Sequence, residues 1–273
     1  TIYINSVSDL LSLAKSCAYD QWSVGKTVIL QKDLSLEGML WEPIPSFSGQ
    51  FKGNGHTISD LTITGQYSPA GLFGIVEEQG SIESLSVRGI VSVSDSADTT
   101  TGGIVGINHG TLINCQFTGV VTGDSEVGGI VGRNESEGTI DHSTARAIVT
   151  GKSSTGGIAG YNLGAITGCT NVGSINTEYQ EASLDTDGFT AKMVDQINNK
   201  MAAADDDATN SVTNVATDTG GIAGRSSGMI LTSVNTGTVG YEHVGYNVGG
   251  IVGRTDGLVS GCVNQGHVLG RKD

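Results

Sequence analysis

Three arginines follow copies of one short glycine-rich word, and they are the residues in this sequence best suited to bind a charged ligand. A guanidinium can hold a carboxylate through two parallel hydrogen bonds, so these arginines point to a carboxylated glycan or a protein carboxylate as ligand. The alternative is that they pair with acids of the chain itself, such as Glu135. The equivalent positions in the five copies are Ile107, Arg133, Tyr161, Arg225 and Arg254.

A polar aromatic segment precedes the last of these arginines and could complete a binding surface. Residues 241–246 read Tyr-Glu-His-Val-Gly-Tyr and combine two phenol rings with an imidazole. We therefore predict one ligand-binding patch on the outer face. Its candidate residues are Arg225, Tyr241, His243, Tyr246 and Arg254.

Asp141, His142 and Ser143 are consecutive and have the residue types of a catalytic triad. Adjacent side chains of a strand point to opposite faces, so we do not expect these three to converge. Cleavage of a polysaccharide needs two or three carboxylates on one outer face, and the aligned copies contain no column of acids. The sequence thus predicts a protein without catalytic activity. A polysaccharide lyase or glycoside hydrolase remains the rival, because loops can also supply carboxylates.

The acidic residues do not form a recognisable metal motif. Residues 185–188 match only part of a calcium loop, which needs further oxygen ligands at fixed positions. The chain contains neither an HExxH zinc motif nor a CxxC pair. We therefore expect no metal and no cofactor.

The charge balance and the hydropathy pattern exclude two classes of partner. With 28 acidic and 14 basic residues the formal net charge is −14, which is unsuited to binding the phosphates of a nucleic acid. A membrane-spanning helix needs about 18 or more consecutive apolar residues, and no run in the sequence approaches that length. We expect no nucleic-acid partner and no membrane span in this segment.

Internal repeats supply the framework that must position these residues. Five copies of a unit begin at the glycine pairs whose second members are Gly103, Gly129, Gly157, Gly221 and Gly250, at steps of 26, 28, 64 and 29 residues. Within the units, short apolar bursts rich in β-branched residues alternate with glycine and polar turn residues, which is typical of strands. A unit of this size cannot enclose a core alone and must stack on its neighbours.

The repeats predict an all-β protein, a parallel β-helix of about seven coils in which equivalent residues lie above one another. The first coils are degenerate copies, which begin at residues 51 and 71. Aliphatic columns are expected to face inward, and an asparagine column at Asn171, Asn235 and Asn264 could form an amide ladder, inside or outside. Right-handed winding is expected because crossover connections prefer it.

The cysteines are predicted to be free thiols. Cys115, Cys169 and Cys262 share a column with Ser143 and Ser233, so a serine-bearing coil separates each cysteine from the next. Two rungs of about 4.8 Å each exceed the Cα separation of about 7 Å that a disulfide tolerates.

The chain is expected to form one domain with four parts. Residues 1–50 form an N-terminal cap and lead-in, which includes a short amphipathic helix starting at Ser6. Coils occupy 51–177 and 218–270. Between them, 178–217 form a helical insertion, in which Phe189, Met193, Ile197 and Met201 recur every four residues; it either docks on the solenoid or binds a partner.

The repeated words GLFG, GIVG and GIAG, which start at residues 71, 103 and 157, resemble the GLUG-motif repeats of bacterial surface and adhesin-like proteins. The resemblance implies a right-handed parallel β-helix and an extracellular or cell-surface location. We expect a non-catalytic adhesive or spacer scaffold module; the alternatives are a carbohydrate-active enzyme and a purely structural stalk. The partner would be a host or cell-surface glycan or protein. Because the last coil carries no cap, we expect further repeats or domains to follow in the parent chain.

Overall fold

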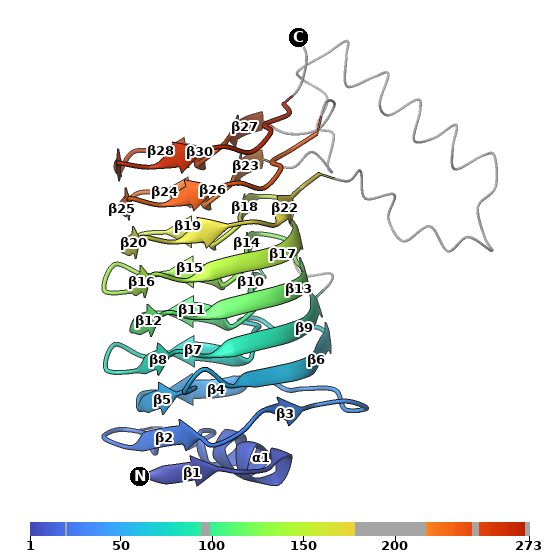
Figure 1. Cartoon of the computed structure of the whole chain (residues 1–273), viewed down its shortest axis with the longest axis vertical. Helices are drawn as coiled ribbons and strands as arrows, with labels where there is room; N and C mark the ends of the chain where they lie inside the picture. The colour runs from blue at the N-terminus through green and yellow to red at the C-terminus, as the bar shows by residue number, and fades with distance from the viewer. Residues whose placement is uncertain (20, 94–98, 178–216, 242–245, 271–273) are drawn as a thin grey trace, which may run out of the picture.

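The computed structural model describes residues 1–19, 21–93, 99–177, 217–241 and 246–270, and these residues wind into a parallel β-solenoid of about eight turns (Figure 1). The turns stack along the long axis from the N-terminus to the C-terminus. The predicted fold is confirmed, with about one more turn than expected. The additional pairing is at the start, where Ile2–Ile4 lies beside Thr27–Leu30, in a region without the repeated glycine word.

Two long sheets form the larger faces of the solenoid, and every pairing in them is parallel. Sheet A contains β1 (Ile2–Ile4), β2 (Thr27–Leu30), β5 (Gln50–Lys52), β8 (Ser81–Glu83), β12 (Thr111–Ile113), β16 (Thr139–Asp141), β20 (Ala165–Thr167), β25 (Met229–Leu231) and β29 (Leu258–Ser260). Sheet B contains β3 (Leu34–Ser35), β6 (Thr57–Gly65), β9 (Ser86–Val93), β13 (Gln116–Thr122), β17 (Thr144–Thr150), β21 (Thr170–Asn171), β26 (Val234–Asn235) and β30 (Val263–Asn264), and β22 (Ser174–Ile175) also pairs with β17.

The other two sheets are joined by the glycine words. Sheet C contains β4 (Ile44–Phe47), β7 (Phe73–Val76), β11 (Val105–Asn108), β15 (Val131–Asn134), β19 (Ala159–Asn162), β24 (Ala223–Ser226) and β28 (Val252–Thr255). Sheet D contains β10 (Thr100–Gly102), β14 (Glu126–Gly128), β18 (Ser154–Gly156), β23 (Thr217–Gly220) and β27 (Tyr246–Gly249). A Cβ atom at Gly132 would lie 2.6 Å from the backbone nitrogen of Thr101, so this glycine is required where β15 passes β10.

The first turn is closed by α1 (Val7–Ser16), which confirms the predicted cap helix (Figure 1). Ser6 is its N-cap, and its hydroxyl accepts a hydrogen bond of 3.1 Å from the backbone nitrogen of Asp9. Leu10 and Leu13 are buried in the solenoid core. The helix thus covers core side chains that the first turn would otherwise expose.

Strand register confirms the aligned columns. In sheet A, Leu112, Ile140, Ile166, Ile230 and Val259 lie above one another. In the cysteine and serine column, the backbone nitrogen of Cys115 donates to the Ser143 hydroxyl over 3.1 Å, and Cys169 does the same to Ser233 over 3.2 Å. All four cysteines are free, as predicted, and burial raises the pKa of Cys115 and Cys169 to about 12.

The predicted asparagine ladder exists and faces inward. Asn171 donates to the side-chain oxygen of Asn235 over 2.8 Å, and Asn235 donates to that of Asn264 over 2.7 Å. The sequence analysis missed a second ladder, at the position after the arginine column in sheet C. Its rungs are Asn108, Asn134 and Asn162, joined by bonds of 2.8 and 2.9 Å and continued by a bond of 3.1 Å to Ser226.

The predicted helical insertion, residues 178–217, lies outside the described residues except for Thr217, which begins β23. Among the residues that the structure describes, no helix is long and apolar enough to cross a membrane.

Candidate functional site

One outward row of side chains runs along the whole of sheet C and contains the predicted arginines. Each strand contributes one residue to it, in register with the residues above and below. We call it the outer row. Its members are Ser46, Ile75, Ile107, Arg133, Tyr161, Arg225 and Arg254.

Tyr161 lies between two arginines of the outer row. The guanidinium carbon of Arg133 is 5.1 Å from the centre of the Tyr161 ring, and that of Arg225 is 5.0 Å away from the same ring. Both distances are within the range of a cation–π interaction. The Tyr161 hydroxyl and the Ser227 hydroxyl are 3.3 Å apart and share a hydrogen bond. The ring therefore restrains both guanidinium groups, a role that the sequence analysis did not assign to it.

Arg133 forms ion pairs with two acids of its own coil. For this arginine the predicted alternative, pairing with Glu135, is confirmed. Its Nε lies 2.6 Å from Glu135, and its Nη1 lies 2.8 Å from Glu126. Burial by itself lowers the pKa of Arg133, but the two carboxylates outweigh it and raise that pKa above the ordinary value. The charge of Arg133 is thus balanced by two carboxylates of the chain itself, which disfavours an external anion at this residue.

Arg225 and Arg254 differ from Arg133, because neither forms an ion pair with another described residue. They are register partners on β24 and β28, half-exposed and exposed respectively. The pKa of the nearby exposed Asp256 is lowered, first by a hydrogen bond from Ser227 and less strongly by the charges of Arg225 and Arg254. The structure thus brings together two of the five predicted binding residues.

The structure describes only part of the other three predicted binding residues, Tyr241, His243 and Tyr246. Tyr241 is half-buried, and its interactions keep it from being a free side chain. Tyr246 begins β27, where its backbone pairs with Thr217 in sheet D, and its side chain lies outside the described residues. His243 also lies outside them. The aromatic ring shown to contact Arg225 is that of Tyr161.

The Asp141, His142 and Ser143 group separates, as predicted, although one detail of the argument was wrong. Asp141 and His142 do meet, at 2.9 Å between Oδ1 and Nδ1, because His142 has a φ of 46° at a corner and does not alternate like a strand residue. Ser143 points inward, is fully buried and accepts from the nitrogen of Cys115. Its hydroxyl is therefore unavailable to a substrate.

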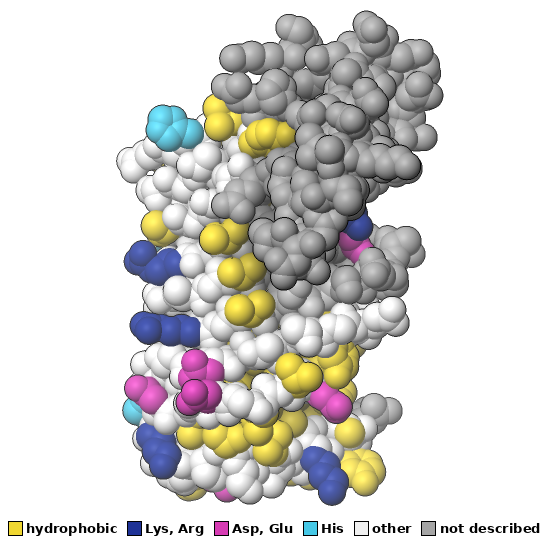
Figure 2. Space-filling model, turned by 90° about the vertical axis from the view of Figure 1, so that its right-hand side faces the viewer, with side chains coloured by type: hydrophobic (Ala, Val, Ile, Leu, Met, Phe, Trp, Pro, Cys, Tyr) yellow, Lys and Arg dark blue, Asp and Glu magenta, His cyan; other side chains and the backbone are white. Residues whose placement is uncertain are grey.

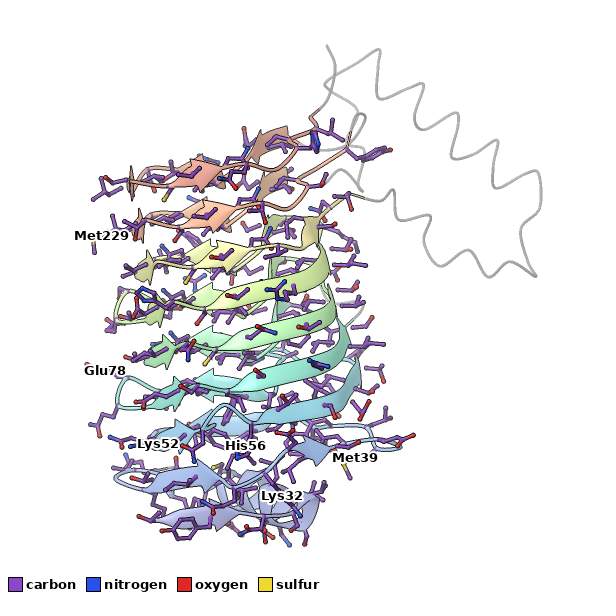
Figure 3. The ribbon with its side chains drawn as sticks, viewed as in Figure 1. Lys32, Met39, Lys52, His56, Glu78 and Met229 are labelled. Carbon is purple, nitrogen blue, oxygen red and sulfur yellow. The ribbon has the colours of Figure 1, made fainter. Side chains whose placement is uncertain are left out.

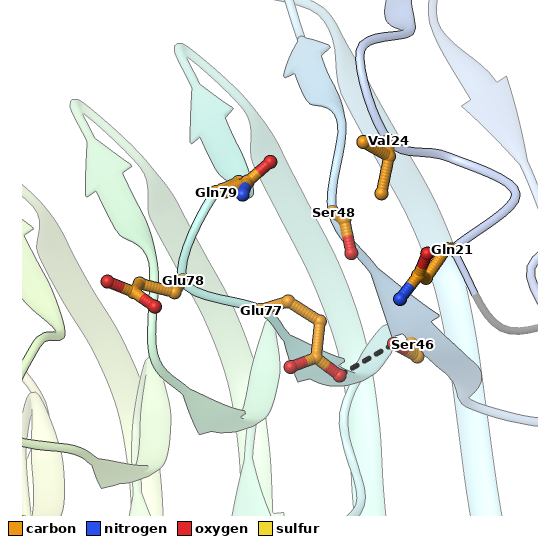
Figure 4. Close-up of a pocket in the computed structure, with 7 residues that line it drawn as sticks. All are labelled: Gln21, Val24, Ser46, Ser48, Glu77, Glu78 and Gln79. Atoms are coloured by element: carbon orange, nitrogen blue, oxygen red, sulfur yellow. Dashed lines mark hydrogen bonds between the residues drawn. The ribbon is translucent and has the colours of Figure 1, made fainter.

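An open cavity of about 450 Å³ lies near the N-terminal end of the outer row (Figure 4). The residues lining it are Gln21, Val24, Ser46, Ser48, Glu77, Glu78 and Gln79. Ser46 donates a hydrogen bond of 2.7 Å to Glu77, whereas Glu78 projects from the edge of the stack (Figure 3). The sequence analysis did not single out this cavity, since its residues come from three separate turns.

Sheet B presents another outward row, of aliphatic side chains. Ile90, Val120 and Ile148 are in register, and Ile90 and Ile148 are 49% and 46% exposed. Figure 2 shows hydrophobic side chains following one another along this side of the molecule. Exposed arginines, Arg88 and Arg146, occupy the parallel row two residues earlier.

No group of three or more His, Cys, Asp or Glu side chains that could hold a metal ion occurs in the part of the chain that the structure describes. Of the acids that contact the outer row, Glu126 and Glu135 are bound to Arg133, and Glu77 is bound to Ser46.

Comparison with known proteins identifies the repeat and the fold. Residues 123–150 match the model of the family described as the GLUG motif, which confirms the predicted resemblance there. The chain is 32% identical over 155 residues to halomucin of Haloquadratum walsbyi, a match that covers 52% of this chain and 2% of halomucin. It is 29% identical over 137 residues to a protein of Evansella cellulosilytica provisionally named a Gly-rich membrane protein, covering 36% of this chain and 16% of that one.

Among solved structures, the fold matches a protein of Bacteroides ovatus that is provisionally named an immunoglobulin A1 protease. The TM-score is 0.62, and the match covers 95% of this chain and 74% of the other, at 17% sequence identity. At this identity the likeness concerns the fold alone. The chain spans only a small part of the two relatives found by sequence.

Proposed function

Because the chain carries the GLUG motif over residues 123–150, we propose that it is a non-catalytic adhesive or spacer scaffold module of a bacterial cell-surface or secreted protein. The observation that carries this proposal is the outer row, which presents one side chain per coil along sheet C. Such a row offers a ligand regularly spaced contacts on a rigid support. The name of one relative, a Gly-rich membrane protein, agrees with a location at the cell envelope.

The chemistry of the described residues favours binding over catalysis. General acid–base cleavage needs a carboxylic acid free to give up its proton at the substrate. Glu126 and Glu135, the acids gathered on the outer row, are instead neutralised by Arg133 over 2.8 and 2.6 Å. The hydroxyl of Ser143 is buried.

The cavity with Glu77 and Glu78 is the observation that favours the second candidate, a carbohydrate-active enzyme. Glycoside hydrolysis uses a pair of carboxyl groups beside the bound sugar, as general acid and as base or nucleophile. In the structure, however, the Glu77 carboxylate accepts a hydrogen bond of 2.7 Å from Ser46.

The test is retention of the purified chain on a panel of immobilised acidic and neutral polysaccharides and host glycoproteins. The flow-through is analysed for shortened chains and unsaturated sugars. Retention without products supports the adhesive module. Retention with products, lost in Glu77→Gln, contradicts the proposal and identifies an enzyme. The absence of retention on every surface contradicts the adhesive role and leaves the spacer role.

A further inference from the structure

We propose that Arg225 and Arg254 form a binding site for the carboxylate of a uronic acid within an acidic polysaccharide. This inference rests on the adhesive role proposed above and gives it a ligand class. The two arginines are register partners on the neighbouring strands β24 and β28 of the outer row, so one ligand group can reach both side chains. A carboxylate can accept several charge-assisted hydrogen bonds from such a pair.

The first argument is preorganisation. The Tyr161 ring lies 5.0 Å from the guanidinium of Arg225, and the Tyr161 hydroxyl is itself held by Ser227 at 3.3 Å. An arginine that is already restrained loses less side-chain entropy when it binds an anion. Arg225 is thus prepared to accept a carboxylate, and its neighbour Arg254 is exposed to reach the same group.

The second argument is that neither arginine is held between two acids as Arg133 is. Two residues after the arginine, where the Arg133 coil has Glu135, the Arg225 coil has Ser227 and the Arg254 coil has Asp256. Asp256 forms no ion pair with either arginine in the part of the chain that the structure describes. Asp218 belongs to the same coil, but its φ of 51° is left-handed, and its carboxylate accepts a 2.7 Å hydrogen bond from Asn247. Asp218 forms no ion pair with Arg225, although both are described.

The third argument concerns the acidic charge of the whole chain. In a protein of net charge −14, Arg225 and Arg254 are two basic groups that form no ion pair with another described residue. At physiological ionic strength the Debye length is about 8 Å, so remote acids are screened while these two guanidinium groups act on a bound anion. The exposed Asp256 lies near the pair: its pKa is lowered first by a hydrogen bond from Ser227 and less strongly by the charges of both arginines.

The surroundings of the pair favour a sugar over a protein as the carrier of the carboxylate. The exposed large apolar residues include none from β19, β24 or β28, whereas protein interfaces depend on buried aromatic and apolar anchors. The hydroxyl groups of Tyr161 and Ser227, which share a hydrogen bond, lie beside Arg225. Such groups are suited to the hydroxyls of a sugar.

The experiment is titration calorimetry of the whole chain with trigalacturonate and with its neutral methyl ester. We expect the acid to bind at least about tenfold more tightly than the ester, and Arg225→Gln/Arg254→Gln to weaken binding of the acid by about tenfold or more. The matched control is Arg88→Gln/Arg146→Gln, which removes the same charge from exposed arginines of sheet B and should change the dissociation constant less than about twofold. Arg225→Lys/Arg254→Lys, which keeps the charge but not the fork, should give an intermediate loss.

Three results would overturn the inference: equal binding of acid and ester, equal losses in the two double glutamine variants, or tighter binding of an aspartate-rich peptide than of trigalacturonate. Circular dichroism of each variant separates loss of the site from loss of the fold. If trigalacturonate does not bind but the chain is retained on the polysaccharide panel, this site is wrong and the adhesive role stands. If both tests are negative, both are wrong.

Discussion

Two interior rows of the solenoid are filled by aromatic and aliphatic side chains in their N-terminal coils and by asparagines further along, from Asn108 in one row and from Asn171 in the other. One interior row runs through Phe47, Val76, Asn108, Asn134, Asn162 and Ser226. The other runs through Ile58, Val87, Phe117, Ala145, Asn171 and Asn235. The change from apolar residues to asparagines occurs within continuous sheets. A change of backbone fold therefore does not impose it.

The comparison shows that apolar and amide rungs depend on their neighbours in different ways. A buried phenyl ring gains stability from contact with any close-packed apolar group. A buried amide needs a donor or acceptor directly above or below it, because an unsatisfied polar group in the interior is costly. Amide rungs should therefore occur in runs and should be energetically coupled, whereas aromatic rungs should act locally.

The largest effect is expected in the aromatic half. Phe73 is fully buried, and its ring centre is 5.3 Å from that of Phe47 and 5.5 Å from that of Phe51. Phe73→Ala should lower the free energy of unfolding by about 3–5 kcal/mol through the cavity it leaves. The measurement is urea unfolding, with Phe73→Leu as the control that keeps most of the volume. A loss below about 1 kcal/mol would mean that these rings are not packed as described.

A smaller effect, with a different signature, is expected in the asparagine half. Asn235→Ala removes the acceptor of Asn171 and the donor to Asn264, at a cost of about 1–3 kcal/mol for a buried group left unsatisfied. The comparison variant is Asn264→Ala, which removes the acceptor of Asn235 at the exposed end of the ladder and should cost less, because water can replace the lost acceptor there.

Coupling is the decisive readout for the ladder. Asn235→Ala alone leaves the buried amide of Asn171 without its acceptor. In the double variant Asn171→Ala/Asn235→Ala that amide is absent, so the loss of unfolding free energy should be clearly less than the sum of the two single losses. Additive losses would show that the amides do not act as a connected ladder.

The sequence predicted one of these ladders and missed the other for a physical reason. Asn171, Asn235 and Asn264 stand in an otherwise apolar register, which marks an asparagine column. Asn108, Asn134 and Asn162 directly follow the outward position, so the alternation of a strand places them inward, but the sequence analysis did not apply this alternation to polar residues. Their burial depends on where each coil turns its corner, and the repeated glycines fix that geometry only in three dimensions.

The candidate site was predictable to a similar extent. Alignment of the repeats placed Arg225 and Arg254 in one outward column, and the register confirms that they are neighbours. The stacking of Tyr161 and the pairing of Arg133 with Glu126 depend on side-chain directions across sheets C and D. Glu126 lies seven residues before Arg133, and only the sharp turn at the glycine pair brings the two together.

A third prediction concerns two buried threonine hydroxyls in sheet D, those of the register partners Thr155 and Thr219. The buried hydroxyl of Thr155 has no hydrogen-bond partner among the described residues, whereas the hydroxyl of its register partner Thr219 accepts a 3.0 Å bond from Asn176. Thr155→Val should therefore raise the free energy of unfolding by about 1 kcal/mol, and Thr219→Val should lower it by a similar amount. Val127 already occupies this row one coil earlier. Equal effects of the two substitutions in chemical denaturation would contradict the difference between these hydroxyls.

The smallest effect is expected on the outer surface. There Arg133 is paired with two acids, whereas Arg225 and Arg254 form no ion pair with another described residue. The pKa of Asp256 lies below its ordinary value of 3.8, mainly because Ser227 donates a hydrogen bond to the carboxylate, then because of a backbone hydrogen bond of Asp256 itself, and least because of the charges of Arg225 and Arg254. Ser227→Ala should raise this pKa the most, Arg225→Gln/Arg254→Gln should raise it less, and Arg133→Gln should leave it unchanged. The carboxyl carbon shift of Asp256, followed by NMR between pH 2 and 6, measures all three. If the double arginine variant has no effect, the charges of Arg225 and Arg254 do not converge on this part of the row, and a bound carboxylate would not experience both of them.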